Sequence, residues 1–396
     1  MRELNFPKKF LLGLQHTLSM FGATVLVPIL TGLNPAIALF SAGVGTLIFH
    51  LITKKKVPVF LGSSFAFIPV LLAVIEKYGA EYAMGGTIVA GIIYVIFAGL
   101  FYLVGVERIQ SFFPPIVIGP VIAIIGLGLS PVAVNMASEN WIVAITVVAT
   151  IFLMSIYCKG FMKLVPILGG IVAGYIVSIF FNMVDFSTVA QSQLIVVPNF
   201  ILPKFNIPAI LTIAPVSFVT ILEHLGDINA NGAVVGKSFV KDPGLHRTAL
   251  GDGLATVFAG LVGGPPNTTY SENTGVLATT KVYDPSILRI AAVMAIIMSF
   301  IGYVGNILLT IPNAVLGGAS LVLFGMIASI GFKTIAQEKV DLNNNRNMLI
   351  MSIILVIGLG GLVLNIKGIE FSSLSIAAFV GIILNKIIPK KGKEEV

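Results

Sequence analysis

Apolar runs long enough to cross a bilayer recur along the whole chain, separated by short clusters of Pro, Gly and charged residues. Residues 85–105 and 348–364 are two continuous examples, and a helix needs about twenty such residues to span the hydrocarbon core. The pattern predicts fourteen segments, which begin near residues 10, 35, 57, 85, 114, 141, 164, 208, 248, 268, 286, 314, 347 and 370. A membrane β-barrel would instead need shorter strands of alternating hydrophobicity. We therefore expect an all-α polytopic membrane protein.

The basic residues predict how these segments are oriented. If the N-terminus is cytoplasmic, alternation through fourteen segments places 21 of the 24 Lys and Arg residues on the cytoplasmic side. Only Lys77, Lys204 and Lys367 then face outward, as the positive-inside rule requires. The first apolar segment is too long for a signal peptide and no cleavage site follows it, so we expect it to remain. The pattern predicts a multi-pass protein surrounded by lipid in the plasma (inner) membrane, with both termini cytoplasmic.

Composition narrows the function classes. The chain is 57% hydrophobic and only 10% charged, with a mean hydropathy of +1.02. Its formal net charge of +7 is what cytoplasmic loops produce, so we expect no nucleic-acid partner. The single cysteine, Cys158, excludes an intramolecular disulfide, and we expect no metal and no cofactor. Because the chain carries no H-E-x-x-H motif, Cys pair or phosphate-cradling loop, we do not expect an enzyme.

Two pairs of short motifs indicate an internal repeat. Leu-Gln-His at 14–16 is echoed by Leu-Glu-His at 222–224, an offset of 208, and GSSFAF at 62–67 is similar to NTTYSE at 267–272, an offset of 205. Nearly equal offsets predict two halves of seven spans, residues 1–190 and 205–396. Since seven is odd, the second half enters the membrane from the opposite side, which is the inverted repeat of secondary transporters.

Polar residues interrupt the third and the tenth predicted spans. TTYSENTG at 268–275 follows a Gly-Gly-Pro-Pro loop, and GSSFAF at 62–67 lies between Pro58 and Pro69. Interrupted helix survives at membrane depth only inside protein or beside a water-filled cavity, and paired interruptions form the substrate site of inverted-repeat carriers. The β-branched and aromatic residues favour an extended stretch over a continued helix at both places. These two stretches are therefore the predicted site of a flat, polar ligand.

Glu223, His224 and Asp227 lie in the eighth predicted span, and Glu272 lies in the tenth. Intramembrane acids are costly, and their default interpretation is functional. Glu223 and Asp227 are four residues apart and share a helix face, which suits a proton relay. One alternative is that the helix ends near Glu223 and that Asp227 caps it in water. His16 and His224 fit a structural and a functional role equally well.

The motifs resemble the signature of the nucleobase–ascorbate transporter family, also called nucleobase:cation symporter family two. Glu272-Asn273-Thr274-Gly275 with Thr280-Lys281 is similar to its defining motif, and Gln15-His16, LGSSFAF and Glu223-His224-x-Gly226 are similar to its other landmarks. The resemblance covers essentially the whole chain. It implies fourteen spans in two inverted repeats, with short antiparallel strands in spans three and ten. It also implies a core domain of spans one to four and eight to eleven, a gate domain of the remaining spans, and a homodimer.

The resemblance also implies roles for individual residues. Glu223 would accept ring N–H groups, Glu272 would bind the opposite ring edge, and backbone groups around Ser271 would assist. Phe65 or Phe67 would face the ligand, and Tyr270 would form an aromatic wall. The residues implied in support or proton coupling are Asp227, His224, Asn273, Gln15 and His16.

Two positions bear on the substrate. Glu272 resembles the uracil branch of the family, because a carboxylate complements the N–H groups of a pyrimidine. Asp227 stands where the uracil branch tends to carry His, and it resembles the xanthine and urate branch. We weight Glu272 more heavily and predict a proton-coupled uracil symporter that works by alternating access. A purine permease is the alternative, and Na⁺ is the less favoured coupling ion.

Two further transport classes share parts of this pattern. An anion carrier of the sulfate-transporter type would have the same architecture, but the acids at this site would repel a divalent anion. A channel would differ by failing to accumulate substrate against its gradient.

Overall fold

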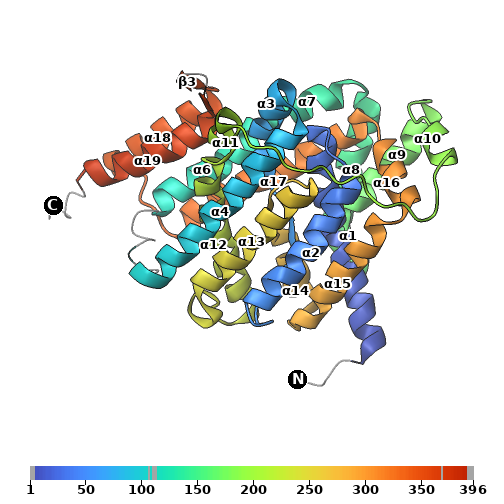
Figure 1. The fold of residues 1–396 in the computed structure, drawn as a ribbon, viewed down its shortest axis with the longest axis horizontal. Helices are drawn as coiled ribbons and strands as arrows, with labels where there is room; N and C mark the ends of the chain where they lie inside the picture. Colours follow the sequence, from blue (N-terminus) through green and yellow to red (C-terminus); the bar gives the residue numbers. More distant parts are fainter. Residues whose placement is uncertain (1–4, 106–107, 109–113, 367–368, 390–396) are drawn as a thin grey trace.

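The protein is a bundle of helices with two pairs of very short strands (Figure 1). The computed structural model describes residues 5–105, 108, 114–366 and 369–389. The two chain ends and Lys367, which entered the predicted orientation, lie outside these residues.

Each of the fourteen predicted segments coincides with a described helix or with a strand followed by a helix. The elements of the first half are α1 (Phe6–Thr31), α2 (Pro35–Ile52), β1 (Leu61–Ser63), the short helix η1 (Phe65–Phe67), α3 (Ile68–Tyr78), α4 (Ala80–Val104), α6 (Pro115–Gly128), α7 (Ser130–Ser138), α8 (Trp141–Tyr157), η2 (Gly160–Leu164), α9 (Pro166–Phe180) and α10 (Ser187–Ala190). The elements of the second half are α11 (Ile207–Ile213), α12 (Val216–Val235), η3 (Val240–Gly244), α13 (Leu245–Val262), β2 (Asn267–Thr269), α14 (Ser271–Thr280), α15 (Pro285–Ser299), α16 (Gly302–Leu309), α17 (Asn313–Gln337), α18 (Asn345–Leu359), β3 (Leu364–Ile366), β4 (Ile369–Phe371) and α19 (Ser373–Ile387).

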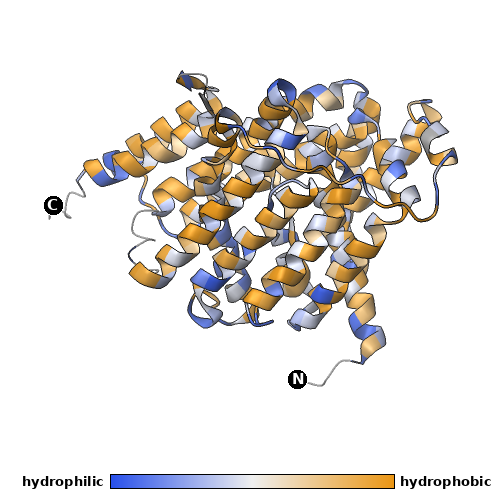
Figure 2. Ribbon diagram, in the orientation of Figure 1, coloured by the Kyte–Doolittle hydropathy of each residue, from blue (hydrophilic) through white to orange (hydrophobic). Residues whose placement is uncertain are grey.

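Length and hydropathy mark a multi-pass membrane protein. Among the described residues, six helical stretches are long and apolar enough to cross a bilayer, and five shorter apolar helices accompany them. Figure 2 shows mostly hydrophobic helices, with hydrophilic residues gathered in the loops at their ends. Large apolar side chains such as Ile145, Phe152 and Ile176 are exposed on the outer helices. In a membrane these side chains contact lipid instead of water.

Small residues let the central helices touch. An ideal Cβ on Gly91 of α4 would lie 2.7 Å from the carbonyl oxygen of Gly253 on α13, and one on Gly253 would lie 2.9 Å from the carbonyl of Gly91. Such mutual approach is typical of helix pairs in membranes, where packing and not the hydrophobic effect holds helices together. In this way α13 packs between α4 and α2, while α15 packs on α1 and α2, and α17 packs on α6, α7 and α8.

The strands β1 and β2 lie in the interior and pair antiparallel, with Leu61 opposite Thr269 and Ser63 opposite Asn267. Two helices hold this pair through equivalent threonines. The Thr46 hydroxyl on α2 accepts a hydrogen bond from Leu61 N at 2.9 Å, and the Thr256 hydroxyl on α13 donates to the Asn267 carbonyl at 3.1 Å. The two strands, one from each half of the chain, are thereby fixed between α2 and α13.

The two stretches that interrupt helix do so as short strands. Only three residues of each are strand, and helix resumes at Phe65 in one and at Ser271 in the other. The reason is backbone hydrogen bonding. A three-residue ladder satisfies few N–H and C=O groups, and at membrane depth the following residues need partners that only helix supplies.

Candidate functional site

Two helix N-termini directly follow the paired strands β1 and β2. Helix α14 begins directly after β2, with only Tyr270 between them, and η1 begins one residue after β1. The first N–H groups of a helix have no partner within that helix, and they carry its positive dipole end. Backbone donors from both halves of the chain therefore lie next to the strand pair, where they suit carbonyl oxygens of a ligand.

Tyr270 braces the strand pair. Its hydroxyl donates to the Ser63 carbonyl at 2.9 Å, and its side chain is only 4% exposed. The ring lies over Gly62, where an ideal Cβ would be 2.3 Å from Tyr270 Cζ. Any side chain at position 62 would displace the ring, so the glycine and the tyrosine form one packing unit. The structure thus places the predicted wall residue against the strands.

The acids of α12 face the other strand. Glu223 and Asp227 lie in the middle of α12, which continues to Val235, so the alternative that Asp227 caps a helix end in water is excluded. The Thr269 hydroxyl of β2 donates to Asp227 Oδ2 at 2.9 Å. Glu223 Oε2 is buried and has no hydrogen-bond partner among the described residues. Glu223 also interacts electrostatically with Glu272 of α14. A buried carboxylate oxygen without a partner is suited to accept N–H groups from a ligand.

Behind these acids lies a buried pair that the sequence analysis missed. His224 Nδ1 is 2.9 Å from Asp252 Oδ2 on α13, and its Nε2 is 3.0 Å from the Thr248 hydroxyl. The histidine and both of its partners are fully buried. His224 is therefore held between α12 and α13, in line with the structural interpretation. An acid within the apolar span at 245–262 was the signal that would have revealed Asp252.

His16 and Asn273 join α1 to α14. The Asn273 amide nitrogen lies 3.0 Å from His16 Nδ1 and donates to the His16 carbonyl at 3.1 Å. Because an amide nitrogen only donates, Nδ1 is the acceptor and the ring proton sits on Nε2. Gln15 is buried beside them on α1. This contact fixes the first turn of α14, which carries Ser271 and Glu272, against α1.

The two phenylalanines of η1 differ in their surroundings. Both belong to the buried core, where Phe67 is 1% exposed and Phe65 is 7% exposed. The Phe65 ring meets Phe324 of α17 edge to face, with centroids 5.9 Å apart. Phe324 is a neighbour of Phe65 that sequence reasoning did not single out.

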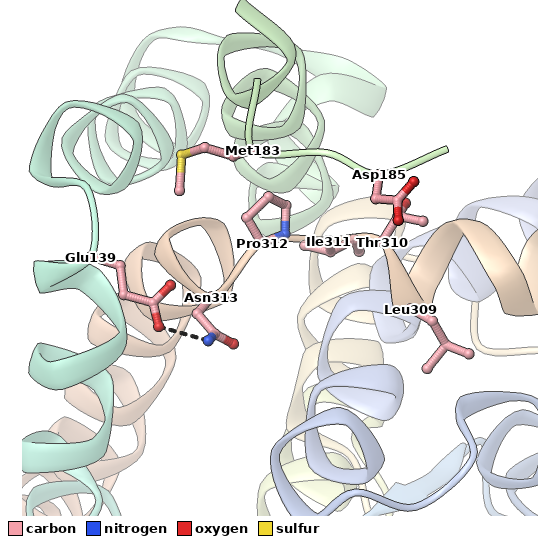
Figure 3. Close-up of a pocket in the computed structure, with 8 residues that line it drawn as sticks. All are labelled: Glu139, Met183, Asp185, Leu309, Thr310, Ile311, Pro312 and Asn313. Atoms are coloured by element: carbon pink, nitrogen blue, oxygen red, sulfur yellow. Dashed lines mark hydrogen bonds between the residues drawn. The ribbon is translucent and has the colours of Figure 1, made fainter. Parts of the chain in front are cut away.

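A cavity of about 510 Å³ opens elsewhere, at the loop ends of α7, α9 and α16 (Figure 3). Its lining residues are Glu139, Met183, Asp185, Leu309, Thr310, Ile311, Pro312 and Asn313. The Asn313 amide donates to Glu139 across it at 2.7 Å. None of the predicted site residues lines this cavity. We place the candidate site at the carboxylates and strands, because buried polar atoms without a partner among the described residues, such as Glu223 Oε2 and the Thr268 hydroxyl, lie there.

The matches to known proteins each extend over most of the chain. A model described as the Permease family matches residues 7–367. A probable uracil permease of Haemophilus influenzae is 43% identical over 396 residues, which cover 98% of this chain and 96% of the relative. The uracil permease of Bacillus subtilis is 42% identical and covers 97% of this chain and 93% of its own. The transmembrane domain of a cyanobacterial bicarbonate transporter, BicA, has a TM-score of 0.65 at 16% identity, covers 97% of this chain and 98% of its own, and shares the fold alone.

Proposed function

Because the chain belongs to the Permease family, the nucleobase–ascorbate transporters that its motifs resemble, we propose that it is a transporter of uracil and not an enzyme. The observation that carries the proposal is the site itself. Glu223 offers a buried carboxylate oxygen without a partner among the described residues, on a helix that packs against β2, and the helix N-termini that follow β1 and β2 supply N–H groups. Uracil has N–H donors and carbonyl acceptors around one small flat ring, so acceptors and donors are both needed.

In this proposal each side of the ring has a partner. Glu223 accepts the ring N–H groups, as charge-assisted hydrogen bonds are the strong ones. Glu272 binds the opposite edge, and the N–H groups around Ser271 donate to a carbonyl. Phe65 covers a face of the ring, since it is the less buried phenylalanine of η1. Tyr270 acts from behind by holding β1 and β2 in register.

Asp227 is the position at which the chain resembles the xanthine and urate branch. Its hydrogen bond with Thr269 argues against a direct role in choosing the substrate. Its Oδ2 accepts the Thr269 hydroxyl at 2.9 Å, so one oxygen is already engaged by β2. We therefore keep uracil as the substrate and a purine permease as the second candidate.

Coupling to protons follows from the spacing of the acids. Glu223 and Asp227 lie one turn apart on α12, and burial with mutual repulsion favours a shared proton. We propose that uptake is driven by H⁺ passing between them, with His224, Asn273, Gln15 and His16 in support. No cluster of potential metal ligands occurs among the described residues, and Na⁺ remains the second choice.

We further propose alternating access between a core and a gate within two inverted repeats, residues 1–190 and 205–396. Equivalent contacts in the two halves support the repeat: Thr46 holds β1 as Thr256 holds β2, at an offset of 210. Likewise α13 packs on α4 as α2 packs on α15. The same proposal includes a homodimer in the plasma membrane. Both termini are placed in the cytoplasm, an orientation that the distribution of basic residues supports.

Binding of uracil and xanthine to the purified protein tests the substrate. We expect uracil to raise the melting temperature and to give a calorimetric binding isotherm, and xanthine to do neither. Glu223→Gln should abolish binding in a folded protein, whereas Glu338→Gln, a matched change at an exposed carboxylate, should not affect it. A response to xanthine alone would transfer the proposal to the purine branch. Accumulation of uracil against its gradient in proteoliposomes would separate a carrier from a channel.

A further inference from the structure

The polar face of α12 continues beyond the two acids to Asn231. Glu223, Asp227 and Asn231 are spaced four residues apart, so they form one stripe along the helix. Asn231 is 0% exposed. Burying an amide is costly unless its groups are hydrogen-bonded, which makes its partners informative.

The Asn231 amide ties three elements together. Its Nδ2 donates to the Pro58 carbonyl at 3.1 Å and to the Thr274 hydroxyl at 3.0 Å. Pro58 leads into β1, and Thr274 lies on α14, two residues after Glu272. Both amide hydrogens are thus used, and the single side chain closes the space between α12, α14 and the segment before β1.

Asn231 lies on the side of the two acids that is nearer the C-terminal end of α12. Asn231 lies between Asp227 and the helix end at Val235, after which come Lys237 and Lys241. These lysines are on the predicted cytoplasmic side. Asn229, two residues earlier, is exposed, so the closure belongs to one face of the helix.

We propose that Asn231 is a positioning residue that seals the carboxylates from cytoplasmic water. The inference rests on the proposed proton coupling. A carboxylate at position 231 would extend the proton relay, because it can take up and release a proton. An amide side chain does not titrate in this way, so it ends the relay. Water reaches Asp227 from the cytoplasm only after the bonds to Pro58 and Thr274 open. Transport without leak requires that this opening accompany the movement of substrate.

Proton leak in the absence of uracil tests the seal. In proteoliposomes that contain a pH-sensitive dye and carry an imposed pH gradient, Asn231→Ala should dissipate the gradient about tenfold faster than the unchanged protein, as expected for roughly 1.4 kcal/mol of lost closure. Asn229→Ala is the matched control and should behave as the unchanged protein. Uracil should still raise the melting temperature of Asn231→Ala. An unchanged leak rate in folded Asn231→Ala would overturn the proposal.

Two further measurements keep the outcome interpretable. Thr274→Val removes one of the two acceptors of the Asn231 amide while it keeps the side-chain shape. If Asn231→Ala does not fold, Thr274→Val takes its place as the test variant, and it should leak faster than the unchanged protein but by less than the tenfold expected for Asn231→Ala. Hydrogen exchange of the segment 271–280 should accelerate in Asn231→Ala and not in Asn229→Ala, whatever ion drives transport. If the unchanged protein moves no protons with uracil, the proposed coupling fails. Unaltered exchange in Asn231→Ala would overturn the seal itself.

Discussion

Replacing Gly62 with alanine is the smallest change that should disable the proposed site without touching an acid. The new Cβ would lie 2.3 Å from Tyr270 Cζ and 2.7 Å from its hydroxyl oxygen. Non-bonded carbon atoms prefer about 3.5–4.0 Å. The ring must therefore retreat by more than about 1 Å, which breaks its 2.9 Å hydrogen bond to the Ser63 carbonyl.

The magnitude follows from two contributions. Overpacking a tight interior costs about 1–3 kcal/mol, and a lost hydrogen bond costs about 1 kcal/mol. Together they disfavour the native strand arrangement by about 2–4 kcal/mol. If only that arrangement binds uracil, the apparent Kd rises by the inverse of its population, or roughly 30- to 700-fold.

A double-mutant cycle separates this cause from a general loss of stability. Uracil Kd is measured by calorimetry for Gly62→Ala, for Tyr270→Leu and for the two together. In the Tyr270→Leu background the added methyl group has room, so Gly62→Ala should weaken binding by less than about threefold, or about 0.7 kcal/mol. Equal effects of Gly62→Ala in both backgrounds would refute the packing argument, as would an unchanged Kd for Gly62→Ala alone.

Three further changes probe the surroundings of the site. Thr269→Val should lower gradient-driven uracil accumulation by on the order of tenfold, because a hydrogen bond to a charged group contributes about 1.5–3 kcal/mol; a loss of less than twofold in radiolabel uptake would contradict this. Asp252→Ala should cost about 3 kcal/mol or more of stability in thermal unfolding, because His224 loses a buried partner, and an unchanged melting temperature would count against it. Lys56→Ala removes an exposed ion pair with Asp242 and should cost less than about 1 kcal/mol, with no effect left at high salt.

The placement of Glu223 and Asp227 on a helix beside the strand pair could be predicted, because each of these acids is costly in its surroundings. Glu223 and Asp227 stand in an apolar run, where nothing but function or a partner justifies their cost. The strands were predictable for a related reason, since Pro and Gly exclude continuous helix at both places. Their short length came from the family resemblance and not from the residues themselves, because it depends on which backbone groups α2 and α13 satisfy. Asp252 is the contrary case. An acid within an apolar span rich in small residues was a sign of function or of a buried partner, but the sequence analysis did not single it out.

Tyr270 shows what a sequence pattern cannot supply. An aromatic residue between a strand and a candidate site acid is equally consistent with two roles: a wall that contacts the ligand, or a side chain that holds the strand pair together. The choice depends on the absence of a Cβ at Gly62, on the opposite strand and far away in the sequence. Phe65 and Phe67 pose the same question, and only the proximity of Phe324 to one of them separates the two.

The fold that this chain shares with a bicarbonate transporter makes charge the deciding feature of its site. Two helix N-termini next to a strand pair favour an anion by themselves. A carboxylate beside them reverses the preference, because two like unit charges roughly 5 Å apart repel by about 3 kcal/mol at an effective dielectric constant of about 20. Glu223 and Glu272 acting on a divalent anion would multiply that cost, while a neutral ring with N–H groups turns the same acids into acceptors. Sulfate and bicarbonate should therefore leave the melting temperature of the purified protein unchanged under conditions in which uracil raises it, and stabilisation by either anion would mean that these acids do not face the ligand.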